Sequence, residues 1–325
     1  MRKLLERGGK VLALALVLLA NVAGAQTYPS QPLHLIVPYA AGGSSDVQAR
    51  IVARGLAEHL GQPVVVENKP GASAIIGTDY VAKQPADGYN LLLAAPPFVI
   101  TPHMQAKVPY EVARDFVGVS LLTRAPMVVA VSASFPARDF AELVAQAKAQ
   151  PGKVSYASVG VGGQGHLVTE LLAKRLGIEL LHVPYKGAAP ALTDLAGGQV
   201  SMMLTTPLDL VAQREAGLIR VIATGAPQRS PSLPDVPTIA ESGFADIDLG
   251  YWFSAVVVRV GTPPDIVRRL AAGIGDVIRQ PEVRAKLVAQ SVEILGSSPA
   301  ECDDFLRAET ARVVEAVRLS GAKAE

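Results

Sequence analysis

The chain has a single cysteine, few aromatic residues and almost no excess of either charge. Cys302 alone cannot form an intramolecular disulfide, so stability must come from hydrophobic cores, and 325 residues are enough for two domains. The formal net charge of +1 offers no basic surface of the kind that nucleic-acid-binding proteins need. The composition therefore excludes a disulfide framework and argues against a nucleic-acid partner.

Metal-binding and nucleophilic motifs are also missing from the sequence. The five histidines are dispersed, and neither H-x-x-x-H nor C-x-x-C occurs. No G-x-S-x-G elbow is present, and no His/Asp pair is spaced so that it must join a serine at one site. We predict no catalytic residue, no metal and no cofactor, hence a protein that is not an enzyme. A secreted hydrolase that uses Ser158 is the alternative.

Long apolar runs are absent except at the N-terminus. There, basic residues precede an apolar run and an A-x-A cleavage site: Arg2, Lys3, Arg7 and Lys10, then residues 11–22, then residues 23–25. The run is too short for a comfortable membrane span. Residues 1–25 are therefore predicted to be a cleaved signal peptide, which places the mature protein in the periplasm of a cell with two membranes. Removing them takes away four basic residues and one acidic residue, so the formal net charge changes from +1 to −2.

After the signal peptide, short apolar runs typical of strands alternate with amphipathic stretches typical of helices. The expected strands are residues 33–37, 64–67, 89–95, 116–122, 127–132, 154–157, 180–184, 200–204, 220–224, 251–258 and a short one near 292–295. Helices are expected at 140–149, 167–176, 189–196 and 302–319, among others. This alternation predicts an α/β protein with mainly parallel sheets flanked by helices.

Two units of strand, glycine-rich turn and helix recur about 120 residues apart, at 33–50 and 154–176. In the first, Ser44, Ser45 and Asp46 are suitable helix caps after Gly42 and Gly43. A helix N-terminus with uncovered amides suits an anion, because the free N–H groups and the helix dipole both point at it. Since no Lys or Arg lies in this first turn, dipoles and hydroxyls would hold the anion. A capped turn without a ligand is the alternative.

The second turn also matches the dinucleotide pattern G-x-G-x-x-G, from Gly160 to Gly165. That fingerprint requires an acidic residue at the end of the next strand, about 20 residues further on. The strand at 180–184 ends without one, and Glu179 precedes it. Dinucleotide binding is therefore disfavoured, whereas anion binding by the same amides is retained. His166 is interpreted as a cap or wall residue rather than a base.

The recurrence predicts two similar domains, the second inserted into the first. We expect one lobe from residues 26–124 and 251–325 and the other from residues 125–250, with crossings near 124–126 and 250–252. Ligands of open α/β sheets bind beyond the carboxyl ends of strands, where both turns lie. The two lobes should therefore enclose a cleft, with the turns at its floor.

Several blocks of sequence occur in an order typical of one family. They are VPYAAGGSSDVQAR, VVVENKPGASAIIG, DGYNLLLA, KVSYASVGVGGQGHLVTELL, HVPYKGAAPALTDLAGGQV and RSPSLPDVPTIAESG. This series closely resembles the Bug-type extracytoplasmic solute receptors, the substrate-binding component of tripartite tricarboxylate transporters. The resemblance implies a two-lobed Venus-flytrap fold, a small carboxylate ligand between the lobes, and integral membrane transporter subunits as partners. We expect a monomer, and a ligand sensor for a signalling partner is an alternative role.

The resemblance also implies the ligand-binding residues. They are Tyr39, Ala41, Gly42, Gly43, Ser44 and Asp46 in the first turn, Ser73 in the GASAIIG stretch, Ser158, Gly160, Gly163, Gln164 and His166 in the second turn, and Thr205 and Thr206 at a strand end. Many relatives carry acidic residues in the strand that here spans 200–206, where this chain has Ser201 and Thr205. Without an acid to pair an ammonium group, a dicarboxylate, tricarboxylate or aromatic acid is expected rather than an amino acid. Asp209 would substitute if it pointed inward.

Overall fold

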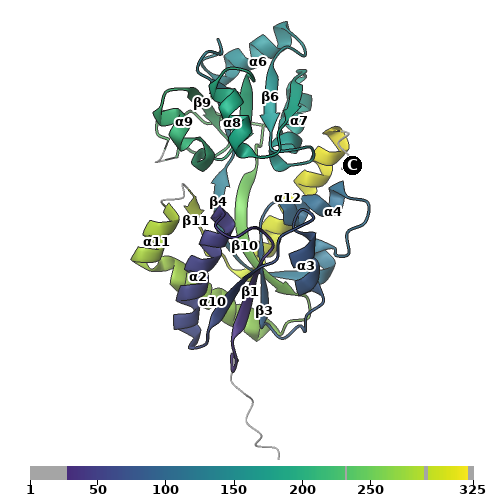
Figure 1. The fold of residues 1–325 in the computed structure, drawn as a ribbon, viewed down its shortest axis with the longest axis vertical. Coiled ribbons are helices and arrows are strands. Elements are labelled where there is room, and N and C mark those ends of the chain that lie inside the picture. The colour runs from purple at the N-terminus through teal and green to yellow at the C-terminus, as the bar shows by residue number, and fades with distance from the viewer. Residues whose placement is uncertain (1–27, 231–232, 289–291, 321–325) are drawn as a thin grey trace, which may run out of the picture.

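The structure is a computed structural model that describes residues 28–230, 233–288 and 292–320. The predicted signal peptide, residues 1–25, lies outside these ranges. The described elements form two lobes, each built on one β-sheet, with two long strands running between them (Figure 1). Within the described ranges, every helix is too short or too polar to cross a membrane.

The first lobe contains a six-stranded sheet in the order β11-β4-β10-β3-β1-β2. Its strands are β1 (Leu33–Val37), β2 (Val64–Asn68), β3 (Asn90–Ala94), β4 (Phe116–Pro126), β10 (Tyr251–Arg259) and β11 (Glu293–Ile294). Its helices are α2 (Ser44–Leu60), α3 (Ile75–Ala82), α4 (Pro97–Met104), α5 (Val112–Asp115), α10 (Pro264–Arg279), α11 (Pro281–Val288) and α12 (Pro299–Ser320).

The second lobe contains a five-stranded sheet in the order β7-β6-β8-β5-β9. Its strands are β5 (Val128–Ser132), β6 (Ser155–Ser158), β7 (Leu181–Pro184), β8 (Met202–Thr205) and β9 (Ile219–Thr224). Its helices are α6 (Phe140–Ala149), α7 (Gln164–Leu176), α8 (Ala188–Ala196), the 3₁₀ helix η1 (Pro207–Leu210) and α9 (Val211–Glu215).

The α/β class and the two-lobed fold are confirmed, but the prediction of mainly parallel sheets is wrong. β1 pairs in parallel with β2 and β3, whereas β10 pairs antiparallel with both β3 and β4. In the second lobe, β6 is parallel to its two neighbours and β5 is antiparallel to its own. The reason is the crossing between lobes. A chain that leaves the first lobe on β4 and returns on the adjacent β10 must run in opposite directions on the two strands.

The crossing itself is more continuous than the sequence suggested. The segment 124–126 was expected to separate two strands, but β4 runs through it and ends at Pro126, paired with Tyr251 of β10. Only Met127 then separates β4 from β5. A proline is tolerated at a strand end because its missing N–H removes no inter-strand hydrogen bond there.

Each lobe has its own hydrophobic core, and α6 shows how the sequence pattern produces it. The helix spans Phe140–Ala149 as predicted, and Asp139 caps it by accepting a hydrogen bond of 2.8 Å from the Glu142 N–H. Phe140, Leu143 and Ala147 are buried on one face. Side chains three and four residues apart share a helix face, and burying each large one contributes about 1.5–3 kcal/mol.

The C-terminal helix α12 contacts both lobes. It packs on β4 and on α7, where Val313 and Ala316 share an apolar cluster with Leu167 and Leu171 of α7 (Figure 1). Helix α12 therefore joins the two lobes.

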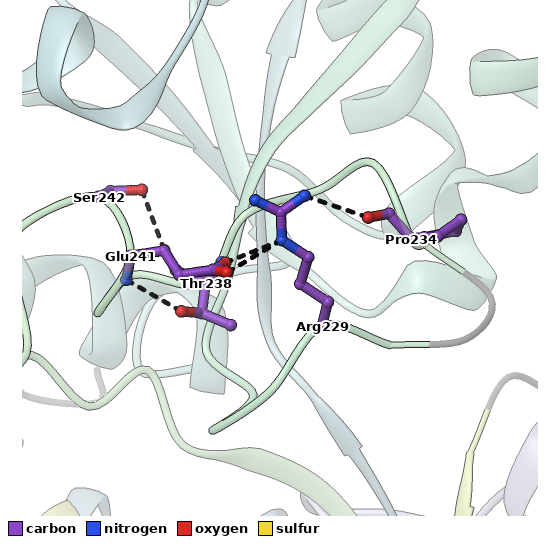
Figure 2. A network of polar contacts seen from close by, with 5 residues as sticks. All are labelled: Arg229, Pro234, Thr238, Glu241 and Ser242. Atoms are coloured by element: carbon purple, nitrogen blue, oxygen red, sulfur yellow. Dashed lines mark hydrogen bonds and ion pairs between the residues drawn. The ribbon is translucent and has the colours of Figure 1, made fainter.

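A Pro/Ser-rich loop follows β9 in the second lobe. Arg229 fastens this loop: its Nε donates to Glu241 and its Nη1 donates to the carbonyl oxygen of Pro234 at 3.2 Å (Figure 2). The Glu241 N–H in turn donates to Thr238 Oγ1 at 3.0 Å. These bonds join the loop to the turn that begins at Thr238, and Thr238 forms a β-bridge with Thr224 of β9.

Candidate functional site

A cleft of about 630 Å³ lies between the lobes, a size typical of small-molecule sites. From the first lobe it is lined by residues that include Tyr39, Ser73 and Met104, and from the second lobe by residues that include Gly163 and Thr205. Residues of the crossing, Met127 and Trp252, complete the lining. The cleft therefore lies where the strand ends of both lobes meet.

No Lys, Arg or His is among the described residues that line the cleft, and Asp209 is the acidic residue among them. Thr205 Oγ1 donates to Asp209 Oδ2 at 2.5 Å and Thr206 Oγ1 donates to the same oxygen at 2.9 Å. Each threonine hydroxyl has a single hydrogen, and both hydroxyls use it in the hydrogen bond to Asp209. Toward the cleft, these hydroxyls therefore present acceptor lone pairs rather than donors.

Gln164, the first residue of α7, links the cleft to the crossing. Its Nε2 donates to the carbonyl oxygen of Tyr251 at 2.7 Å. Its Oε1 is buried and has no hydrogen-bond partner among the described residues. A buried acceptor without a partner is costly, so a donor from a ligand or a water molecule would be stabilising here.

The first turn is organised by Asp46, which lies behind it rather than in the cleft. Asp46 accepts hydrogen bonds from the Gly42 N–H at 2.9 Å, Arg50 Nε at 3.0 Å and Asn68 Nδ2 at 2.8 Å. Burial alone would raise the pKa of Asp46, but these hydrogen bonds outweigh burial and lower it to about 2. Asp46 therefore stays ionised and holds the turn in one conformation.

The expected serine caps of α2 are not formed. The N-cap residue is Gly43, and no side chain caps the helix. The N–H groups of a first helical turn have no partner within the helix. They are therefore left for solvent or a ligand, which is the property that an anion site needs.

The second turn has the same construction. Helix α7 begins at Gln164, three residues earlier than predicted, and its N-cap Gly163 also lacks a side-chain cap. The Gly162 N–H donates to His166 Nδ1 at 3.0 Å, so His166 holds the turn just before the helix. Gly162 has a φ of +77°, so the turn favours glycine there. A Cβ at this position would lie 2.5 Å from Met104 Cε, the movable end of a flexible side chain.

The structure separates the predicted site residues into three groups. Those that line the cleft are Tyr39, Ser73, Gly163, Gln164, Thr205 and Thr206. Those on the exposed side of the first turn are Ala41, Gly42, Gly43 and Ser44. Those within or behind the turns are Asp46, Ser158, Gly160 and His166. Direct ligand contact by these residues stays a prediction.

Sequence reasoning missed much of the apolar wall. Met104 and Ile100 of α4 line the cleft, together with Pro96 and Pro97 at its start. The signal available was their position: they follow strand 90–94 at its carboxyl end, where ligands of α/β sheets bind. Asp209, which the sequence analysis left open, does line the cleft.

Two lobes joined by paired crossing strands, with a cleft between their strand ends, define this chain as a two-lobed solute-binding protein of the periplasmic binding protein fold. The family model described as "Tripartite tricarboxylate transporter family receptor" matches residues 48–320. The chain belongs to this family, which consists of periplasmic solute-binding receptors and not of enzymes, and the resemblance found in the sequence is confirmed.

Individual relatives agree with this assignment. Protein BugT of Bordetella pertussis is 38% identical over 307 residues, which cover 94% of this chain and 94% of BugT. A solved structure of R. palustris Rpa4515 with adipate is 34% identical with a TM-score of 0.76, covering 91% of this chain and 99% of that chain. MatC from Rhodopseudomonas palustris with bound malate is 27% identical with a TM-score of 0.73, covering 89% and 100% of the two chains.

Proposed function

We propose that this protein captures a small carboxylate between its lobes and delivers it to integral membrane transporter subunits. The observation that carries the proposal is the second turn, where the uncapped N-terminus of α7 lines the cleft. Free amides and the helix dipole provide for an anion in a cleft whose described lining has no cationic side chain. Relatives whose structures hold adipate and malate support a carboxylate ligand.

The walls of the cleft favour a ligand with an apolar body. Ile100, Met104, Val161 and Trp252 offer apolar surface around the amides. The Asp209 carboxylate and the acceptor hydroxyls beside it disfavour a second or third carboxylate on that side, because like charges repel. Among the expected acids, an aromatic acid or a long dicarboxylate therefore fits better than a compact tricarboxylate.

Closure of the lobes provides the signal to the transporter. The exposed first turn and the cleft-lining second turn belong to different lobes, so a ligand contacts both only when the lobes approach. A ligand that binds the closed form more tightly than the open form shifts the population toward it. We propose that this closed form is what the membrane subunits recognise.

The remaining sequence predictions are retained as part of this proposal. They are a cleaved signal peptide at 1–25, a monomer in the periplasm, and lobe boundaries after residue 124 and before residue 251. Pairing of Arg124 with Glu293 in one sheet and of Val128 with Thr205 in the other supports a boundary between them.

Native mass spectrometry of the purified protein, followed by calorimetry with benzoate, adipate, malate, citrate and glutamate, tests the proposal. We expect a retained acid or binding of benzoate or adipate. Binding of glutamate alone, or of none of these acids by a protein free of bound ligand, would contradict it. Uptake assays in a deletion strain then separate delivery to a transporter, in which uptake is lost, from sensing, in which only gene induction is lost.

A further inference from the structure

The two turns have the same geometry but are held by chemically different side chains. In each, a glycine with positive φ precedes a glycine N-cap: Gly42 at +83° and Gly162 at +77°. In each, that first glycine donates its N–H to the side chain four residues ahead. The acceptor is the carboxylate of Asp46 in the first lobe and the imidazole of His166 in the second.

His166 lies in a stack of rings behind the second turn. It is 7% exposed, and its ring lies 4.1 Å from the ring of His182 with an angle of 14° between the planes. The Tyr156 ring lies 4.8 Å from the His182 ring and 6.5 Å from the His166 ring. His182 Nε2 lies 2.6 Å from Ser158 Oγ, which donates to the carbonyl oxygen of Gly160 at 3.1 Å. The two imidazoles therefore hold the turn at both of its ends.

The bond to Gly162 requires a neutral imidazole. A backbone N–H can only donate, so His166 Nδ1 must present a lone pair. A protonated ring would place an N–H against the Gly162 N–H and a positive charge against His182. Asp46 faces no such change, because its carboxylate can accept at any pH at which it is ionised.

Among the described residues, three titratable groups face His166, and of these only the Glu170 carboxylate raises its pKa, against the larger effect of burial. They are Glu170 of α7, His182 of β7 and Tyr156 of β6. Glu170 Oε1 already accepts a hydrogen bond of 2.5 Å from the Tyr156 hydroxyl. Burial lowers the pKa of His166, although Glu170 partly offsets it, and burial and then His166 lower the pKa of His182.

We propose that His166 is a positioning residue that keeps the second turn in its ligand-binding form only while its imidazole is neutral, so that acidification weakens ligand binding through the second lobe alone. This inference rests on the proposed function, because Gly162 and Gly163 act on the ligand by lining the cleft. His166 itself is not among the lining residues, so its charge acts on the turn and not by direct contact.

The first test needs no ligand. In the ligand-free protein, the NMR resonance of the Gly162 amide should shift in step with protonation of the His166 ring, while the Gly42 amide stays unchanged over the same pH range. A Gly162 amide that does not follow the ring would overturn the proposal.

The second test measures ligand affinity at about pH 7.5 and about pH 5, the range in which a histidine changes charge. The probes are adipate, malate and benzoate. Wild type should bind more weakly at the lower pH than at the higher one. His166→Asn, which keeps an acceptor oxygen near the Nδ1 position but cannot be protonated, should lose this dependence. His166→Leu should bind weakly at both pH values.

Two controls complete the design. His59→Asn, on the partly exposed side of α2, should behave as wild type. Protonation of the probe itself affects the affinity of all variants equally. If His166→Asn loses as much affinity at the lower pH as wild type does, the proposal is overturned. If no probe binds wild type at pH 7.5, the proposed function for these acids is refuted, and the Gly162 resonance still decides the role of His166.

Discussion

Replacing Asp46 by Asn tests the proposed role of this carboxylate in the first turn. The substitution keeps the size of the side chain but removes the charge that accepts from Gly42, Arg50 and Asn68. The pKa of Asp46, lowered from 3.8 to about 2, corresponds to about 2 kcal/mol of stability at neutral pH. We expect Asp46→Asn to reduce the free energy of unfolding by about that amount.

The pH dependence gives the sign of the effect. Because the folded-state pKa lies below that of the unfolded chain, the stabilisation is complete above about pH 4 and is lost as the pH falls through about 2. The stability difference between wild type and Asp46→Asn should therefore shrink as the pH is lowered. If the stability difference between wild type and Asp46→Asn does not shrink in this pH window, the charge of Asp46 is not the source of the stabilisation.

Urea unfolding followed by tryptophan fluorescence is a suitable assay, since the one tryptophan, Trp252, lies on β10 of the six-stranded sheet. Asp276→Asn provides a matched control, because that carboxylate is half exposed and ion-pairs with Arg279 at the surface. Surface pairs contribute between 0 and about 1 kcal/mol. Equal effects of the two substitutions at neutral pH would refute the reasoning about Asp46.

Three further substitutions probe the cleft and the joint between lobes. Gly43→Leu should abolish binding of the acids that wild type binds. The melting temperature should stay within a few degrees, because a Cβ at Gly43 meets only the Ala40 carbonyl oxygen, at 3.6 Å. Unchanged affinity in calorimetry would show that the first turn does not contact the ligand. Thr205→Val should cost about 0.5–1.5 kcal/mol in urea unfolding, since the hydrogen bond from the buried Thr205 to the exposed Asp209 carboxylate is lost. A neutral result would mean that this hydroxyl is not needed to satisfy the carboxylate. Leu171→Ala should cost about 2–5 kcal/mol, because Leu171 is 1% exposed in the cluster that joins α7 to α12; a cost below about 1 kcal/mol would mean that the contact between these helices adds little.

The site shows where prediction from the sequence worked and where it stopped. Both glycine turns followed from local pattern, because a turn, a strand end and a helix start are decided within about ten residues. The predicted serine caps did not form, and the cause is also local. The side chain of Asp46, two residues further into α2, holds the turn by accepting a hydrogen bond from the Gly42 N–H. Met104 and the apolar wall were missed because their place beside Gly162 depends on how the lobes meet.

By itself the sequence determined the elements of this protein, most closely the helix from Phe140 to Ala149, and through its ordered motifs the family. Periodicity and capping are contacts between near neighbours, so they are readable along the chain. Only the tertiary structure decided that β4 runs unbroken into the crossing, that the Thr205 hydroxyl donates its hydrogen bond to Asp209, and that His166 stacks on His182. Those features join residues from separate elements, and a strand direction, a hydroxyl orientation or a ring stack exists only once the elements have packed.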